Sequence, residues 1–161
     1  MDSTSTSKIW ELEKEDKQDE AFELLERLSS NKDPLALIEL GTRYICCEGS
    51  KPPVKIIPKD EEKGNQLMNE GRAELEKLAS SGDGEAMRML SYTYLNLLGI
   101  FDKDIPLAEE WLLKSFDSGC YFSANDLHTF YMHSDKEKAK YYYDQASHHK
   151  CRVVYNKDYE S

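Results

Sequence analysis

Residues 84–119 read GEAMRMLSYTYLNLLGIFDKDIPLAEEWLLKSFDSG and contain two amphipathic patterns separated by a short turn. In the first pattern Ala86, Leu90 and Tyr94 recur at helical spacing, and in the second Ala108 and Trp111 do the same. Each pattern predicts a helix with one apolar face, so the stretch predicts a helical hairpin. One hairpin leaves a second face uncovered, and neighbouring copies are therefore expected.

The same patterns recur on both sides of this hairpin. The sequence DPLALIELGTRYICCEG places Ala36, Leu40 and Tyr44 in the register of the first helix, and SDKEKAKYYYDQASHH repeats the second helix. Before them, AFELLERLSSNK matches the second helix type, with no first-type partner preceding it. The chain is thus predicted to be all-α, a short α-solenoid of stacked helical hairpins with about three repeats plus an N-terminal helix.

This pattern resembles the Sel-one-like repeat family, a relative of the tetratricopeptide repeats. Its clearest motifs are ALIELGTRY at residues 36–44 and LAEEWLLKSFDSG at residues 107–119. The second copy has Ser91 where the first has Gly41, and the third copy, YFSANDLHTFYMH, keeps only Ala124 in register. The resemblance implies an α-solenoid that binds other proteins, without naming the partner.

The repeats set the expected domain boundaries. Residues 1–7 are expected to be disordered, residues 8–149 to form the repeat domain with an insertion at residues 49–59, and residues 150–161 to form a C-terminal tail. The first helix is expected to start at Lys8 or Asp16 and to end at Ser30. Prolines exclude helix from the insertion, so its apolar residues either pack against the hairpin or are available to a partner.

Helix starts are marked by residues that accept hydrogen bonds from the first backbone amides. Asp33, Asp83 and Asp104 are predicted N-caps, with proline close behind Asp33 and Asp104. Ser134 and Glu137 have the spacing of a capping box.

The net charge of −10, from 31 acidic and 21 basic side chains, narrows the class of partner. Phosphates and anionic membranes both favour a basic surface, so neither nucleic acid nor membrane is expected as a partner. A basic protein is favoured, although an acidic surface is also a common solubilising feature. No signal peptide or membrane helix is found and the four cysteines show no pairing pattern, so a cytoplasmic location is expected.

Side chains that carry chemistry are sparse. His148, His149 and Cys151 form the densest group of metal-ligand types, but adjacent histidines on a helix point in different directions. Neighbouring acids such as Glu109 and Glu110 suit the first turn of a helix, and no nucleotide-binding or metalloprotease motif occurs. The chain is therefore predicted not to be an enzyme and to need no cofactor or metal.

The predicted binding face follows from helical phase. Residues opposite the packing stripe of the first-type helices are expected to line a groove, with Tyr92 as the strongest contact. An ordinary polar surface is the alternative. The expected contact residues are Glu39, Arg43 and Cys46 in the first copy, Arg88, Tyr92 and Asn96 in the second, Asn125 and His128 in the third, and Val54, Ile56 and Ile57 in the insertion.

Size, charge and lack of catalytic motifs together predict a small immunity or inhibitor protein that neutralises a partner, possibly a toxin. Two alternatives are an adaptor or scaffold and a repeat protein that associates with copies of itself. The identity of the partner does not follow from the sequence.

Overall fold

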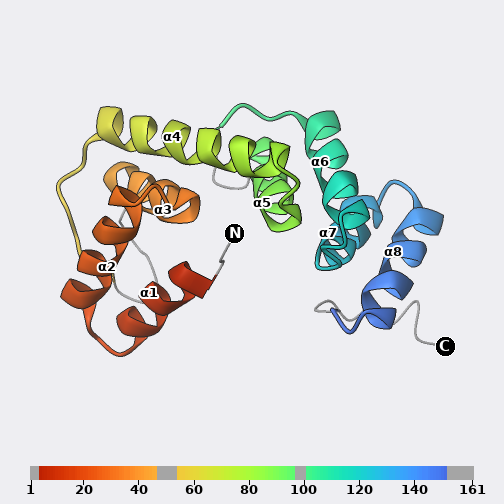
Figure 1. Ribbon diagram of the computed structural model, residues 1–161, viewed down its shortest axis with the longest axis horizontal. Helices are drawn as coiled ribbons and strands as arrows, with labels where there is room; N and C mark the ends of the chain where they lie inside the picture. The colour runs from red at the N-terminus through yellow and green to blue at the C-terminus, as the bar shows by residue number, and fades with distance from the viewer. Residues whose placement is uncertain (1–3, 47–53, 97–100, 152–161) are drawn as a thin grey trace. The chain divides into compact units, whose positions relative to one another are not determined.

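The computed structural model describes residues 4–46, 54–96 and 101–151, which form eight α-helices and no strand (Figure 1). By contacts the chain divides into two compact units, residues 1–77 and 78–161, and the division falls near the end of the fourth helix. The helices are α1 (Thr4–Lys14), α2 (Gln18–Ser30), α3 (Pro34–Ile45), α4 (Glu61–Ser80), α5 (Gly84–Leu95), α6 (Ile105–Asp117), α7 (Ser123–Tyr131) and α8 (Lys136–His148). Helix α1 packs on α2, α2 on α3, α5 on α6, α6 on α7 and α7 on α8, and the predicted all-α solenoid class is confirmed.

The first unit begins with a pair of helices where the sequence predicted only one. The chain turns between α1 and α2 at Asp16, which has a φ of 63°, and the Lys17 N–H donates to the Leu12 carbonyl at 2.9 Å. The lone second-type helix was therefore a wrong prediction, because α1 packs against α2. Helix α1 also starts at Thr4, earlier than the expected boundary at Lys8, and residues 1–3 lie outside the described part of the chain.

The core of the first unit joins all three leading helices. It consists of Ile9 from α1, Ala21, Phe22 and Leu25 from α2, and Ala36 and Leu40 from α3. These are the apolar stripes of the amphipathic patterns, and their burial supplies the main stabilisation of the unit.

Helices α3 and α4 approach closely at small residues. A Cβ atom added to Gly41 would lie 2.5 Å from the Met68 Cγ and 2.7 Å from the Gly64 carbonyl oxygen. Such contacts are too short for real atoms, so glycine is required there by space rather than by backbone conformation. The residue in the same register of the second copy, Ser91, is fully buried and accommodates its side chain.

The second-type helices share one way of ending. In each, a residue with positive φ is followed by an amide that donates back to the carbonyl five residues earlier, as in the Schellman motif. The positive-φ residues are Lys32 after α2, Gly82 after α4, Gly119 after α6 and Lys150 after α8. The turns that follow these four helices therefore repeat along the chain, as the apolar stripes of the helices do.

The N-cap predictions hold for three helices and fail for one. The Oδ1 atoms of Asp33, Asp83 and Asp104 accept backbone N–H groups at 2.9–3.0 Å, as expected. Helix α8 is capped by Asp135, which accepts from the Lys138 N–H at 3.0 Å, and not by Ser134. The capping-box prediction is wrong because the adjacent carboxylate takes that role.

The insertion leaves the repeat geometry intact. The Asp60 N–H donates to the Tyr44 carbonyl at 2.9 Å, and in the second copy the Asp104 N–H donates to the Tyr94 carbonyl at 2.9 Å. The connection from α3 to α4 is longer than that from α5 to α6, yet both end with the same hydrogen bond to the tyrosine carbonyl near the end of the preceding helix. Residues 47–53 and 97–100, including part of the predicted insertion, lie outside the described residues.

The second unit packs α5 on α6, α6 on α7 and α7 on α8. Leu112, Leu127, Tyr131 and Ala139 form one buried cluster within it. Trp111 is only half-buried, although the sequence pattern placed it on the packing stripe. Of the predicted C-terminal tail, residues 152–161 lie outside the described part of the chain.

Candidate protein-binding surfaces

The described part of the insertion is fixed onto the first unit at two points. Ile57 packs against the core, and the Lys55 Nζ lies 2.9 Å from the Asp19 Oδ1 and over the Phe22 ring. Ile56, between these anchors, is 85% exposed. Of the two fates expected for the insertion, packing therefore applies to Ile57 and exposure to Ile56, while Val54 is half-buried.

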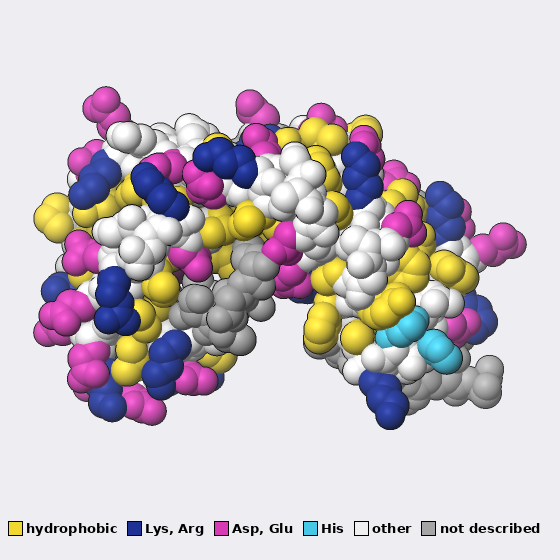
Figure 2. All heavy atoms as spheres, in the orientation of Figure 1, with side chains coloured by type: hydrophobic (Ala, Val, Ile, Leu, Met, Phe, Trp, Pro, Cys, Tyr) yellow, Lys and Arg dark blue, Asp and Glu magenta, His cyan; other side chains and the backbone are white. Residues whose placement is uncertain are grey.

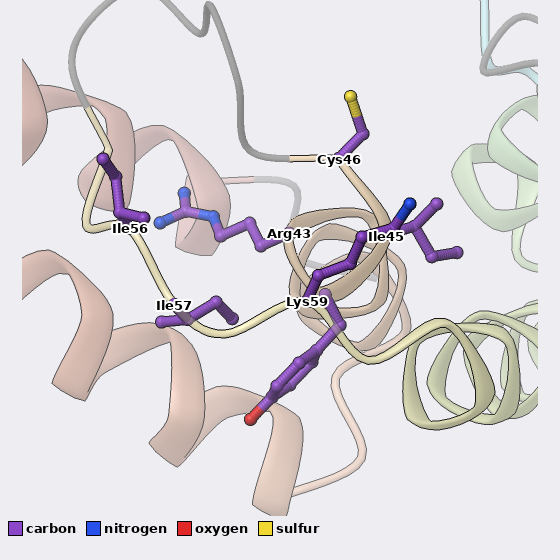
Figure 3. Close-up of a pocket in the computed structure, with 7 residues that line it drawn as sticks. Arg43, Ile45, Cys46, Ile56, Ile57 and Lys59 are labelled. Carbon is purple, nitrogen blue, oxygen red and sulfur yellow. The ribbon is translucent and has the colours of Figure 1, made fainter.

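A pocket of about 270 Å³ opens beside this segment (Figure 3). Arg43 extends toward the loop segment that carries Ile56. Cys46 lies at the end of α3, and its side chain is exposed. The lining residues are Arg43, Tyr44, Ile45, Cys46, Ile56, Ile57 and Lys59. Most of this wall is apolar, and Ile56 is its most exposed large apolar side chain.

Arg43 is held in a buried ion cluster. Its side chain is 4% exposed, and its Nη2 lies 2.6 Å from the Glu13 Oε1 and 2.9 Å from the Glu39 Oε1. Glu13 is equally buried, and burial raises the pKa of its carboxyl above the ordinary value, against the lowering effect of Arg43. Arg43 therefore links α3 to α1 and is not the open groove residue that helical phase predicted.

Glu13 is a residue that the sequence reasoning missed. It lies four positions after Ile9, on the apolar stripe of α1. A carboxylate on such a stripe is a signal for a buried ion pair. The Glu39 carboxylate accepts from the Arg43 Nε at 2.9 Å while its side chain stays 44% exposed, and its contact with a partner stays a prediction.

A second arginine cluster joins α5 to α7 in the second unit. The Arg88 Nε donates to the Asp126 Oδ2 at 2.5 Å, and its Nη2 donates to the Tyr92 hydroxyl at 2.7 Å. Glu85 lies 3.4 Å from the same guanidinium. Burial, with the nearby Asp126 carboxylate, raises the pKa of Tyr92, which stays protonated. The structure therefore brings Arg88 and Tyr92 together, as part of a helix-to-helix link whose carboxylates the sequence reasoning had not included.

Three other predicted contact residues serve the fold. Asn96 ends α5 in the left-handed conformation, and its Oδ1 accepts from the Phe101 N–H at 3.0 Å. Asn125 is buried and donates to the Cys151 carbonyl. His128 is buried, with its Nδ1 3.0 Å from the Ala139 carbonyl oxygen. The expectation that Asn125 and His128 line an open face is wrong, because neighbouring segments cover them.

The second unit also exposes aromatic side chains, among them Tyr141, which the sequence placed at an end of the last helix that is open unless the tail covers it. Phe122 and Tyr141 are about half exposed, and the His149 ring stacks on Tyr121 with centroids 3.4 Å apart. Figure 2 shows hydrophobic side chains and histidines together over α8.

Other kinds of site find little support in the described ranges. No group of three or more His, Cys, Asp or Glu side chains there is arranged to hold a metal ion. Within the same ranges, every helix is too short or too polar to cross a membrane.

The architecture defines a repeat protein built from helical hairpins. The Sel1 repeat family matches residues 34–71, 84–120 and 132–150, which together span more than half of the chain. The chain therefore belongs to the Sel1 repeat family, as the sequence motifs predicted. Sel1 repeats are protein–protein interaction modules and are typically non-catalytic. No curated protein and no solved structure matches the chain.

Proposed function

We propose that this protein binds one basic protein partner and neutralises it, in the manner of a small immunity or inhibitor protein. The observation that carries the proposal is the exposure of Ile56 at 85% on a segment that is anchored on both sides. A large apolar side chain held outward by a fixed backbone resembles a binding anchor, because little conformational entropy is left to lose on association. Family membership supplies the general role of protein binding.

The charge around this segment supports a basic partner. Lys55 is surrounded by carboxylates, and its pKa is raised by its hydrogen bond with Asp19 and further by Glu26 and Glu23. The bases near Ile56 are each paired with a carboxylate: Arg43 with Glu13, Lys55 with Asp19 and Lys59 with Glu61, whereas Glu23 and Glu26 add further exposed acids on α2. Together with the net charge of −10, this favours attraction of a basic surface.

The binding surface is accordingly assigned to the first unit. It comprises Val54, Ile56 and Ile57 of the insertion, the pocket beside Arg43, exposed Glu39, and the acids Asp19, Glu23 and Glu26. Arg88, Tyr92 and Asn96 are assigned mainly to holding the second unit together. The protein is proposed to act in the cytoplasm and without catalysis of its own.

The proposal is tested by capturing the partner on the tagged protein in its native host and then assaying the purified pair. Loss of the partner's activity at a one-to-one ratio supports neutralisation. A partner that is bound and fully active would instead indicate an adaptor or scaffold. Light scattering of the protein alone provides the control for self-association, because a mass that rises with concentration would place the surface between copies.

A further inference from the structure

Residues 54–57 have the features of an unpaired strand. They lie in neither a helix nor a strand, and Lys55 and Ile57 contact the first unit whereas Ile56 between them faces solvent. Alternation of this kind is typical of extended chain. Pro58 follows Ile57 and disfavours helical backbone at that residue.

Within the described part of the chain, no partner strand lies beside the backbone of this segment. Of the backbone hydrogen bonds among the described residues, none involves Val54, Ile56 or Ile57, and the next one along the chain is from the Asp60 N–H to Tyr44. An extended segment with unpaired N–H and C=O groups is a template for another strand. Addition of a partner strand to such an edge is an established way in which proteins recognise peptides.

The surroundings of the segment define the chemistry of the added strand. Asp19, Glu23 and Glu26 are all exposed on α2, and the Lys55 Nζ lies 2.9 Å from the Asp19 Oδ1, which places this helix beside the segment. On the other side, Ile56 and the apolar wall of the pocket offer contacts for uncharged side chains. A strand that alternates basic and apolar residues matches both neighbours.

We infer that the partner contributes an extended basic segment, which pairs with the backbone of residues 54–57 as an added strand. Its apolar side chains contact Ile56 and the pocket, and its cations face the acids of α2. This inference rests on the proposed function and specifies how the partner is held.

A random dodecapeptide library displayed on phage provides the probe, selected on the intact protein. The expected result is enrichment of peptides in which basic and apolar residues alternate. Amide exchange of the protein with a synthetic selected peptide then reports pairing directly. Slowed exchange is expected at alternate positions of the segment, either at Val54 and Ile56 or at Lys55 and Ile57, because successive amides of a strand point to opposite edges.

Matched variants test the two side-chain contributions. Ile56→Asp is expected to weaken peptide binding by at least about tenfold, whereas Ile56→Val, which keeps a β-branched apolar side chain, changes it by less than about twofold. The combined change Asp19→Asn, Glu23→Gln and Glu26→Gln is expected to weaken it by about tenfold and to reduce its dependence on salt. Circular dichroism on each variant checks that the helices remain.

Three outcomes would overturn the inference: no enrichment, enriched peptides without basic residues, or equal exchange protection at all four amides or at none. If selected peptides bind but are lost on Tyr92→Ala and not on Ile56→Asp, strand addition fails while protein binding stands. If the native host also yields no protein partner, the proposed function fails as well.

Discussion

Each unit contains an arginine that joins the first helices of consecutive hairpins, but the two arginines are buried to different depths. Arg43 on α3 reaches Glu13 on α1 with a side chain that is 4% exposed, whereas Arg88 on α5 reaches Asp126 on α7 and is 19% exposed. Helical phase assigned both to a binding groove. The structure shows instead that the same kind of position carries a link between repeats.

The difference in burial decides what each link contributes. A buried ion pair is costly to break, because removal of one partner leaves an unpaired charge in a poorly hydrated place. A partly exposed pair loses less, because water solvates the remaining charge. We therefore expect the first unit to depend on its arginine more strongly than the second.

The largest expected effect is that of Arg43→Ala. It leaves Glu13 buried without its partner and is expected to lower the free energy of unfolding by about 3–5 kcal/mol. Urea denaturation followed by circular dichroism measures the change. The double variant Arg43→Met with Glu13→Leu serves as control, because it removes both charges and is expected to recover most of the loss. A loss of less than about 1 kcal/mol in Arg43→Ala would contradict the buried link.

The pH dependence of the same variant gives an independent check. The pKa of Glu13 is raised in the folded protein by burial, so the folded state holds its proton more tightly than the unfolded state. The stability from this group is therefore present at low pH and is lost as pH rises through the folded pKa. Without Arg43 the pKa rises further, and the deficit of Arg43→Ala relative to the natural protein is expected to be smaller near about pH 5 than near about pH 7. A deficit that does not change with pH would show that Glu13 is hydrated.

The next largest effect concerns the helix crossing in the first unit. Gly41→Ala places a Cβ against Met68 and the Gly64 carbonyl, and it is expected to lower the unfolding free energy by about 1–3 kcal/mol despite the better helix propensity of alanine. At the matching position of the second unit, Ser91→Ala is expected to change stability by about 1 kcal/mol or less, since the site already holds a Cβ. Thermal melts of both proteins compare the two crossings. Stabilisation by Gly41→Ala would mean that α4 has room to move away.

A smaller effect is expected for Arg88→Ala. Loss of its bonds to Asp126 and Tyr92 is expected to lower the unfolding free energy by about 1–2 kcal/mol, because the cluster is only partly shielded from water. A double-mutant cycle with Asp126→Asn isolates the pair. A change as large as that of Arg43→Ala would remove the contrast between the units.

The smallest effect on stability is expected for Ile56→Asp. Ile56 is exposed, and the substitution is expected to change the unfolding free energy by less than about 0.5 kcal/mol. The control is Ile57→Asp, which places a charge against the core. Its loss of unfolding free energy is expected to be several-fold larger than that of Ile56→Asp. Equal melting temperatures for the two variants would show that the segment is not anchored at Ile57.

Much of the fold was predictable from the sequence because it follows from local rules. The apolar stripes placed the repeats, and Asp33, Asp83 and Asp104 marked helix starts correctly. The break between α1 and α2 was missed, because the turn uses Asp16 in the left-handed conformation and no glycine or proline announces it.

The candidate surface was less predictable because it depends on which segments cover which faces. Helical phase placed Arg43, Asn125 and His128 on an open face, but other segments bury them: Glu13 of α1 contacts Arg43, the Cys151 carbonyl accepts from Asn125, and α8 of the same hairpin covers His128. Such contacts join residues far apart in the sequence and leave no periodic signal. In the insertion, the prolines correctly identified a loop. The sequence could not tell which of its apolar side chains is buried, and the structure shows that Ile57 packs on the core while Ile56 is exposed.

Site-specific photo-crosslinking in the native host tests the central claim most directly, namely that a protein partner is bound through the exposed surface of the first unit. A benzophenone amino acid is placed at Ile56 in one variant and at Tyr92 in another, and crosslinked products are compared after brief illumination. A discrete crosslink to another protein from position 56, with none from position 92, is the expected result. A crosslink from position 92 and none from position 56 would contradict the assignment and move the binding surface to the Arg88 cluster of the second unit.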